Sequence, residues 1–369
     1  MRYNWQQNDW TKFSYDASKL EEKLYAFAEK SGRISGILKA LSKEDHIQAM
    51  IHIMVAEAVK TSEIEGEYIS RIDVLSSIRN NLGLNTNQAT VKDNRAEGMA
   101  TLITDIQNSY VETLTKEKLF DWHKIIFPIS SKICVGAWRT HEDPMQVVSG
   151  RVDKPTVHFE APPSKQVPLE MDYFIQWFND TAPKGVHEIK HAPIRSAISH
   201  LYFETIHPFE DGNGRIGRAI AEKALSQTVG YPLLLSLSST IEANKKAYYN
   251  ALKVGQSSNE ITDWLVYFID VILMAQDESE SLIDFTLKKA KLFDHYLGQL
   301  NDRQIKAAKR MLDEGPKGFE GGMTAKKYMR INQTSKPTAT RDLQKLVELN
   351  FFKVEGEGRS TSYQINFLN

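Results

Sequence analysis

Residues 207–218 combine, within twelve positions, the side chains needed to handle a nucleotide phosphate. They read His-Pro-Phe-Glu-Asp-Gly-Asn-Gly-Arg-Ile-Gly-Arg. His207 carries an imidazole, which exchanges a proton near neutral pH and can act as a general base. Asp211 supplies a hard carboxylate oxygen of the kind that binds Mg²⁺ beside phosphates. Together these two residues predict proton transfer next to a metal-bound anion.

The glycines and arginines of the same run predict the anion site itself. Gly212 and Gly214 permit backbone angles that are closed to other residues, so successive amides can point into one concavity. If a helix begins here, its free amides and its positive end strengthen that site. Arg215 and Arg218 are three residues apart and share one helix face, where both can reach the same polyphosphate. The alternative is an ordinary glycine-rich turn before a basic helix, which the combination of residues disfavours.

The run resembles the signature of the Fic family, His-x-Phe-x-[Asp/Glu]-Gly-Asn-Gly-Arg-x-x-Arg, and it matches at every specified position. The resemblance implies an enzyme with a helical core that moves AMP from ATP to a hydroxyl group of a protein. It implies that His207 is the catalytic base and that Asp211 holds Mg²⁺. The nucleotide would contact the residues that follow, namely Gly212, Asn213, Gly214, Arg215, Ile216, Gly217 and Arg218.

An apolar stripe upstream leads to a further charged residue. Ser42 and Asp45 predict a capped helix start, and the apolar residues that follow recur every three or four positions. The same spacing continues to Glu65. A carboxylate at the end of a buried face needs a cationic partner, for which the arginines of 207–218 are candidates. Alternatively, the helix ends one turn earlier and Glu65 is solvated.

Residues 61–66, Thr-Ser-Glu-Ile-Glu-Gly, resemble the inhibitory motif of the same family, [Ser/Thr]-x-x-x-Glu-[Gly/Asn]. In that family the glutamate pairs with the second arginine of the signature, which is Arg218 here. The pair keeps the γ-phosphate of ATP from its productive place. The resemblance therefore implies that Glu65 inhibits the enzyme. Because the motif and the core lie in one chain, this inhibition would be intramolecular.

Residues 136–163 change from helical spacing to short apolar runs joined by turns, which predicts strands. The resemblance places a β-hairpin, the flap, beside the active site in this stretch. The flap of the family leads into a double proline, which matches Pro162 and Pro163. An extended target segment can hydrogen-bond to such an exposed edge, and a plain surface hairpin is the alternative. The flap residues expected at the site are Val157, His158, Phe159 and Glu160.

Other side chains that could carry chemistry have simpler interpretations. The resemblance implies that Tyr248 contacts the adenine, with core packing as the alternative. His123 lies close to an apolar helix face, which favours a structural histidine. Residues 187–191 read His-Glu-Ile-Lys-His, the spacing of a zinc protease helix. Pro193 follows so closely that the helix would be too short, and we interpret the match as coincidence.

The pattern of elements predicts a mainly α-helical fold in four parts. Residues 1–112 form an N-terminal helical region with the inhibitory motif, 113–275 the Fic core with its β-hairpin flap, 276–300 a connector helix, and 301–369 an α+β domain. The last part reads helix, helix, helix, hairpin, which is the order of a winged helix. It carries 13 Lys and Arg residues against 8 Asp and Glu, which would suit nucleic acid. Winged helices also dock proteins, and DNA binding is the less favoured interpretation.

The composition of the whole chain limits the compartments and the kinds of partner that we expect. Its formal net charge is −1, which gives no general attraction to nucleic acid or membranes. The single cysteine, Cys134, excludes an intramolecular disulfide framework and fits a reducing compartment. The first residues show no apolar signal segment. We therefore expect a cytoplasmic protein without a membrane partner, and the family resemblance is compatible with a homodimer.

The function expected from these observations is that of a protein adenylyltransferase that uses ATP and Mg²⁺. It would modify a Ser, Thr or Tyr hydroxyl of a target protein or of itself and would be inhibited by Glu65. The first alternative is a phosphodiesterase that uses the same site to remove AMP from a modified protein, with Glu65 positioning a water molecule. The second is a DNA-binding regulator whose Fic core only senses a ligand.

Overall fold

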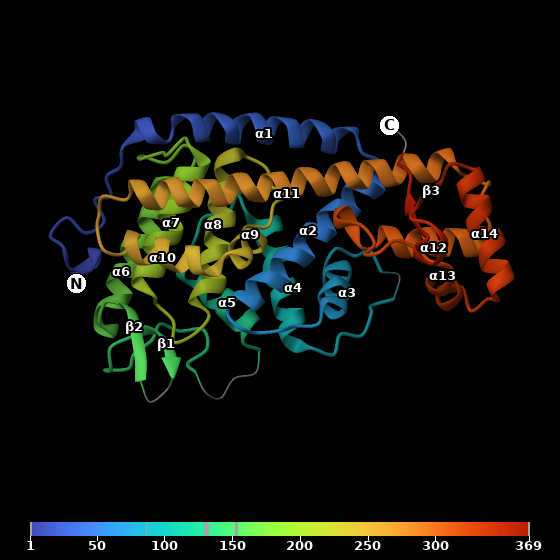
Figure 1. The fold of residues 1–369 in the computed structure, drawn as a ribbon. Coiled ribbons are helices and arrows are strands. Elements are labelled where there is room, and N and C mark those ends of the chain that lie inside the picture. The colour runs from blue at the N-terminus through green and yellow to red at the C-terminus, as the bar shows by residue number, and fades with distance from the viewer. Residues whose placement is uncertain (1, 86, 129–132, 152–153, 368–369) are drawn as a thin grey trace. The chain divides into compact units, whose positions relative to one another are not determined.

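The structure is a computed structural model that describes residues 2–85, 87–128, 133–151 and 154–367. Over these residues the fold is mainly α-helical with two small antiparallel hairpins, as the sequence predicts (Figure 1). No helix in these ranges is both long enough and apolar enough to cross a membrane.

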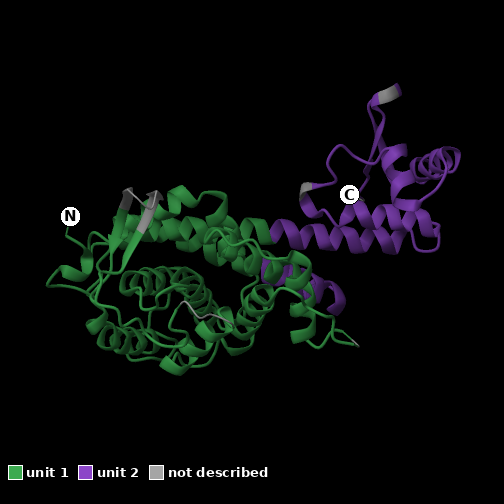
Figure 2. Cartoon of the chain, turned by 90° about the horizontal axis from the view of Figure 1, so that it is seen from below, with its two compact units in different colours: residues 1–33, 50–279 green, residues 34–49, 280–369 purple. Residues whose placement is uncertain are grey.

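Internal contacts divide the chain into two compact units (Figure 2). The first unit comprises residues 1–33 and 50–279, and the second comprises residues 34–49 and 280–369. The boundary that we predict after residue 112 from motif content lies inside the first unit.

The helices of the first unit are α3 (Arg71–Asn81), α4 (Asn94–Ser109), α5 (Lys116–Ile126), α6 (Val167–Asp180), α7 (Ala192–Ile206), α8 (Asn213–Val229), α9 (Leu237–Ala243) and α10 (Lys245–Gly255). Three longer helices contribute residues to both units, namely α1 (Glu21–Ala40), α2 (Lys43–Ile64) and α11 (Thr262–His295).

Helices α7 and α8 form the centre of the first unit. Every residue of α7 is buried, and so is every residue of α8 from Arg215 to Ser226. A helix that is buried on all sides is typical of a position surrounded by other elements. The core around the two helices includes Leu201, Leu225 and Trp264. The loop between α7 and α8 is therefore anchored at both ends in the most buried part of the unit.

Helix α2 ends in a glycine-terminated turn. Gly66 has a φ of +80°, a left-handed angle that glycine adopts without steric cost. The amide of Gly66 donates to the carbonyl of Glu63, and the amide of Glu67 donates to the carbonyl of Ser62. These two bonds satisfy carbonyls that the end of the helix would otherwise leave free. The turn thereby fixes the residues on both sides of the glycine.

The predicted hairpin is present as β1 (Gln146–Arg151) and β2 (Lys154–Glu160), which pair antiparallel with an irregular register after Val147. The N-terminal arm supports its second strand. Trp5 donates from Nε1 to the carbonyl of Glu160 at 2.8 Å.

The helical interpretation of residues 187–191 is also excluded, as expected, because this segment has no helical structure and leads into α7.

One continuous helix, α11, stands where the sequence pattern predicts two, over 259–275 and 277–298. Gln276 lies between the two predicted segments and breaks the apolar pattern. It is buried, and its side-chain amide donates to Ser31 at 2.8 Å and to the carbonyl of Phe27 at 3.3 Å. Because α1 supplies these partners, a polar residue can stand inside the helix without ending it.

The second unit contains α12 (Asp302–Leu312), α13 (Ala325–Asn332), α14 (Lys336–Glu348), β3 (Phe352–Glu355) and β4 (Ser362–Ile365). Strands β3 and β4 pair antiparallel, and Met323 adds a single antiparallel bridge to Tyr363. The buried side chains that join these elements include Tyr328, Leu343 and Phe351. The order of helices and hairpin expected for residues 301–369 is thus present.

Candidate active site

His207 lies at the junction between α7 and the loop that leads to α8. Its backbone has a φ of 50° and a ψ of 60°, a left-handed conformation that is uncommon for residues other than glycine. Its amide donates to the carbonyl of Phe203 at 2.9 Å and closes the last turn of α7. Its own carbonyl accepts a hydrogen bond of 2.8 Å from Nε of Arg139. A strained residue that is fixed on both sides is typical of a functional position.

Arg139 is buried and donates to neutral oxygens. Besides His207, its guanidinium contacts the carbonyl of Ile206 at 3.3 Å, the carbonyl of Pro162 at 2.5 Å and the hydroxyl of Ser164 at 2.8 Å. Burial lowers the pKa of Arg139 to about 10, so the side chain keeps its charge at neutral pH. It therefore ties the end of α7 to the segment that follows β2.

Two side chains hold the loop between α7 and α8. The side chain of Asn213 accepts the amide of Phe209 at 2.9 Å and donates to the carbonyl of Phe209 at 2.8 Å. Nδ1 of His123 accepts the amide of Gly136 at 2.9 Å, so Nε2 carries the proton and donates to the carbonyl of Asp211 at 3.1 Å. Burial lowers the pKa of His123, which keeps the ring neutral. These contacts agree with the structural role that we predict for His123, and they assign the side chain of Asn213 to the loop.

The N-terminus of α8 follows directly. Gly212 is its N-cap with a φ of +81°, and a Cβ there would lie 2.8 Å from Ile126 and from Phe127. The first amides of a helix have no partner within it and form an anion site. A methyl group at Gly214 would overlap with Oε1 of Glu65. The carboxylate of Glu65 therefore lies against the positive end of α8.

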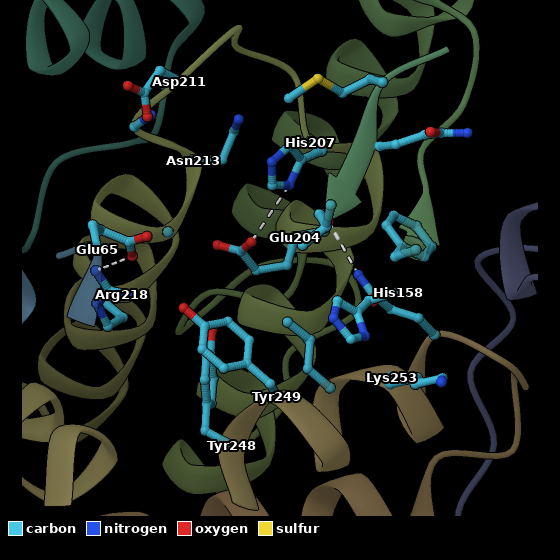
Figure 3. Close-up of a pocket in the computed structure, with 18 of the residues that line it drawn as sticks. Glu65, His158, Glu204, His207, Asp211, Asn213, Arg218, Tyr248, Tyr249 and Lys253 are labelled. Atoms are coloured by element: carbon cyan, nitrogen blue, oxygen red, sulfur yellow. Dashed lines mark hydrogen bonds and ion pairs between the residues drawn. The ribbon is translucent and has the colours of Figure 1, made fainter. Parts of the chain in front are cut away.

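Arg218 and Glu65 form the ion pair that the family resemblance implies (Figure 3). Nη2 of Arg218 lies 2.7 Å from Oε1 of Glu65, and the same guanidinium donates to the hydroxyl and the carbonyl of Thr61 at 2.8 and 3.0 Å. The side chain of Arg218 is 1% exposed, whereas that of Glu65 is 29% exposed. Burial lowers the pKa of Arg218, but the acidic groups around it, Glu65 foremost, together raise it by more, so it lies above its ordinary value.

Arg215 has an acidic partner from the same turn of α2. Its Nη1 lies 3.0 Å from Oε2 of Glu67, and its Nη2 lies 3.8 Å from the carboxylate of Asp211. The guanidinium also lies over the ring of Phe127, 4.7 Å from its centroid. The turn at the end of α2 therefore supplies one carboxylate to each of the two arginines.

A pocket of about 740 Å³ opens beside these groups. Figure 3 shows the Glu65–Arg218 pair on one side of it and His207 with Glu204 next to that pair. Of the residues predicted to bind nucleotide, the structure brings five into its lining, namely Gly212, Asn213, Gly214, Arg218 and Tyr248. Arg215, Ile216 and Gly217 are not among the lining residues, since Ile216 is fully buried and Gly217 packs against Glu204.

Two tyrosines of α10 line the pocket with different exposure. Tyr248 is 2% exposed, and its hydroxyl lies 2.8 Å from Nε2 of His200. Tyr249 is 40% exposed, and partial burial raises its pKa to about 12, so it stays protonated. The lysines Lys246 and Lys253 add positive charge to the same wall.

The flap residues are placed differently from one another. His158 and Phe159 line the pocket, and Phe159 is buried against Tyr3 with ring centroids 4.9 Å apart. Val157 is exposed, and Glu160 accepts a hydrogen bond from Gln146 at 2.9 Å. Two of the four predicted flap residues therefore reach the site.

Glu204 lies one helical turn before His207 and is 4% exposed. Its Oε2 is 3.6 Å from Nδ1 of His207, longer than an ordinary hydrogen bond. Burial raises the pKa of Glu204, but attraction to His207, His200 and Arg218 lowers it by more, to below the ordinary value. The carboxyl group is therefore ionised at neutral pH.

The sequence interpretation did not identify Glu204, Arg139 or Glu67. Glu204 had a signal, because residues three apart on a helix share a face, and Glu204 stands three before His207. Glu67 also had one, since it stands two residues after Glu65 across a terminating glycine. Arg139 had no local signal, because its partners come from two segments that are distant from it in sequence.

Comparison with known proteins gives two family matches along the chain. Residues 113–225 match the Fic/DOC family, and residues 3–84 match a domain of unknown function, DUF4172. A protein of Drosophila mojavensis named Protein adenylyltransferase Fic is 23% identical over 246 residues, which cover 65% of this chain and 43% of that protein. The chain spans about half the length of the curated relatives that it matches.

Two solved structures share the fold. A Fic family protein from Desulfovibrio desulfuricans has a TM-score of 0.52 at 19% identity and covers 93% of this chain and 95% of its own. A Fic domain containing signaling protein from Bacteroides thetaiotaomicron has a TM-score of 0.53 at 20% identity, over 71% of this chain and 97% of its own.

Proposed function

We propose that this chain, whose residues 113–225 belong to the Fic/DOC family, is a protein adenylyltransferase. It would transfer AMP from ATP to a Ser, Thr or Tyr hydroxyl of a target protein or of itself. The observation that carries the proposal is a single pocket lined by His207, the amide end of α8 and Arg218. A base, an anion site and a cation are the parts that transfer of a phosphate-linked group requires.

The chemistry of the pocket walls suggests how ATP would lie. The α-phosphate would bind at the amides of Asn213 and Gly214, where the positive end of α8 stabilises negative charge. The γ-phosphate would bind Arg218 once Glu65 has left it. Arg215 would assist the outer phosphates after parting from Glu67. The adenine would lie toward α10, where we extend the contact predicted for Tyr248 to the more exposed ring of Tyr249.

Asp211 is the residue that would hold Mg²⁺. Its side chain is 59% exposed, and one carboxylate oxygen accepts the amide of Gly212 at 2.6 Å, which leaves the other for an ion. The described part of the chain contains no cluster of three or more His, Cys, Asp or Glu side chains placed to hold a metal. Mg²⁺ in phosphate sites needs only one or two carboxylates, because phosphates and water complete its shell. The residues present therefore fit an ion that binds with the nucleotide and neutralises phosphate charge.

In the proposed reaction, Nε2 of His207 accepts the proton of the target hydroxyl. The hydroxyl oxygen forms a bond to the α-phosphorus, and the bond from that phosphorus to the oxygen bridging to the β-phosphate breaks. Pyrophosphate leaves with the electron pair. The amides of Asn213 and Gly214 stabilise the charge that develops on the α-phosphate oxygens. A target segment extended along β2 would bring its hydroxyl to His207, since His158 and Phe159 line the same pocket.

Inhibition by Glu65 is part of the proposal. Its carboxylate lies on Arg218 and against the end of α8, the two places that phosphates need. Two oxyanions cannot share one buried guanidinium without strong repulsion. Removing the carboxylate should therefore open the site to ATP.

Two variants test the proposal. Incubation of Glu65→Gly with labelled ATP and Mg²⁺ should give a protein that gains one AMP mass, and wild type should gain less. His207→Ala in that background should lose about 10²–10⁴-fold in rate, the usual contribution of a general base. Transfer of another group by Glu65→Gly, or full transfer without His207, would overturn the assignment.

Removal of AMP is a second candidate because Glu65 remains 29% exposed and lines the pocket, where it could position a water. An AMP-modified target incubated with wild type and with Glu65→Gly separates the two activities. Loss of AMP with wild type alone would favour removal.

Residues 301–369 of the second unit are proposed to form a winged helix that docks a protein partner. Support comes from the order of α12, α13, α14 and the β3–β4 hairpin, with the added bridge at Met323. Its basic excess keeps DNA as the less favoured partner. A homodimer and a cytoplasmic location are also part of the proposal, from the resemblance and from the composition.

A further inference from the structure

A buried carboxylate and a partly buried imidazole face each other in the pocket. Oε2 of Glu204 lies 3.6 Å from Nδ1 of His207, and Figure 3 shows the two side chains directed at one another. Within the described residues, neither Nδ1 of His207 nor Oε1 of Glu204 has a hydrogen-bond partner. Buried polar atoms are rarely left without one, so such a pair calls for a functional explanation.

Gly217 allows this approach. A Cβ at this position would overlap with Oε1 of Glu204 and would lie 3.3 Å from Cε1 of His200. The helix that carries Arg218 therefore has a gap in its side chains where the carboxylate of Glu204 lies. A larger residue would push Glu204 away from its present place.

We propose that Glu204 is the positioning residue for His207. Its carboxylate accepts a hydrogen bond from the Nδ1–H group, and this fixes the ring in the tautomer whose Nε2 is free to take the proton of the target hydroxyl. The inference rests on the proposed function, since it concerns the same base. The distance of 3.6 Å shortens to a hydrogen bond when the target hydroxyl and the nucleotide fill the pocket, because catalytic contacts tighten in the complex.

The charged and titratable groups around Glu204 suit this role. His200 and His207 face it from α7, Arg218 faces it from α8, and Tyr248 faces it from α10. His200 is held in the core by its bond to Tyr248 and by stacking on Trp264. Glu65, the nearby acid of the inhibitory turn, is paired with Arg218.

The proton balance follows from this arrangement. The proton of the target hydroxyl moves to Nε2, and the ring becomes an imidazolium with a proton on each nitrogen. Glu204 stays ionised and stabilises that positive charge. The proton on Nε2 then passes to the departing pyrophosphate or to solvent, and the ring returns to its starting tautomer.

The test uses Glu204→Gln in the Glu65→Gly background, where the inhibitory carboxylate is absent. The rate of AMP transfer should fall at least about tenfold, because the amide can also donate and favours the wrong tautomer. The acid limb of the pH–rate profile should move about one unit lower, since the imidazolium loses a neighbouring charge. ATP affinity should not change. Glu204→Asp, which keeps the charge but withdraws it, should give a smaller shift of the limb.

Glu222→Gln in the same background is the matched control. Glu222 is a buried glutamate of α8 that does not line the pocket. Its replacement should leave both the rate and the acid limb in place. An unshifted limb in Glu204→Gln, or an equal shift in the control, would overturn the proposal.

A readout without activity separates this inference from the proposed function. In protein with ¹⁵N-labelled histidine and no nucleotide, the His207 signals are identified by their loss in His207→Ala. The neutral ring should carry its proton on Nδ1 in Glu65→Gly and should lose that preference in Glu204→Gln. An unchanged tautomer rejects the role of Glu204 whatever the activity, and absence of AMP transfer by Glu65→Gly rejects the proposed function alone.

Discussion

Two buried arginines on neighbouring helices differ in the charge of their partners, which are neutral oxygens for one and a carboxylate for the other. Arg195 on α7 donates to the carbonyls of Phe178 and Ala224 at 2.7 and 3.2 Å and to the side chain of Gln227 at 2.8 Å. Arg218 on α8 instead binds a carboxylate, that of Glu65 at 2.7 Å. Burial lowers the pKa of Arg195 to about 9, whereas the acidic groups around Arg218, Glu65 foremost, together outweigh burial and raise its pKa.

The difference separates a scaffold arginine from a site arginine. Backbone oxygens inside a packed core cannot leave without disrupting the fold, so the contacts of Arg195 are permanent. A carboxylate at the end of a helix can be exchanged for a phosphate oxygen, because both are oxyanions that accept from a guanidinium. Arg139 belongs with Arg195 by this criterion, and Arg215 belongs with Arg218.

The largest expected effect is on Arg218 itself. Arg218→Ala in the Glu65→Gly background should reduce the rate of AMP transfer about 10³-fold, because arginines that contact transferring phosphates contribute that much or more. The initial rate of labelled AMP incorporation measures it. Arg218→Lys keeps the charge without the planar guanidinium group, so its rate of AMP transfer should lie between those of the parent and of Arg218→Ala. If Arg218→Ala keeps a rate within a few-fold of the parent, Arg218 has a structural role like that of Arg195.

Arg195 should show the reverse profile. Arg195→Met leaves buried carbonyls without a donor, so the free energy of unfolding should fall by about 3 kcal/mol. Denaturant unfolding measures the loss, with Arg218→Met as the control. The control should lose less stability, since Glu65 is partly exposed and can be hydrated. A larger loss in the control would contradict the division between the two arginines.

Glu67 tests whether Arg215 shares the behaviour of Arg218. Glu67→Gln removes the charge from the 3.0 Å contact and should raise the rate of AMP transfer about threefold, as expected for a partly exposed ion pair. The comparison of single and double variants with Glu65→Gly shows whether the two gains multiply. If the rate does not rise in either background, Arg215 is not held back by its acidic partner in the way proposed for Arg218.

The smallest effect concerns a buried glutamate without an arginine. Burial raises the pKa of Glu222 well above its ordinary value, and the charge of Glu57 raises it further. The folded state therefore holds a proton that the unfolded state releases, and stability falls as the pH rises from the ordinary pKa of a glutamate toward the raised one. Glu222→Gln keeps the acceptor for Gln107 and removes this dependence.

Thermal unfolding at two pH values measures that change. The Tm of Glu222→Gln should exceed that of wild type by a few degrees at pH 8 and by less at pH 5. An equal or larger gain at pH 5 would show that the carboxyl group is not protonated in the folded protein.

The sequence predicts those parts of the site that depend on neighbours in the chain. The spacing within 207–218 predicts the glycine turn and the helix after it, and the apolar stripe of α2 leads to Glu65. It does not predict Arg139, whose partners are more than twenty residues away in two segments. Nor does it show that the side chain of Asn213 closes the loop on Phe209, because the motif alone does not give the direction of the amide.

Helix α11 and Tyr248 show the same limit in the fold. A buried glutamine resembles a break until α1 is known to supply its partners, so one helix is predicted as two. An aromatic residue with helical spacing can line a pocket or pack in the core, and Tyr248 does both. In each case the deciding contact comes from an element distant in sequence.

The proposed competition between Glu65 and phosphate for Arg218 is tested most directly by binding of ATP and Mg²⁺, measured by calorimetry in the His207→Ala background so that no reaction occurs. We predict that adding Glu65→Gly tightens binding at least about tenfold, as expected when a 2.7 Å ion pair at a buried guanidinium no longer competes with the ligand. Adding Arg218→Ala to the same protein should cancel that gain. Equal affinity with and without Glu65, or a gain that persists without Arg218, would contradict the account.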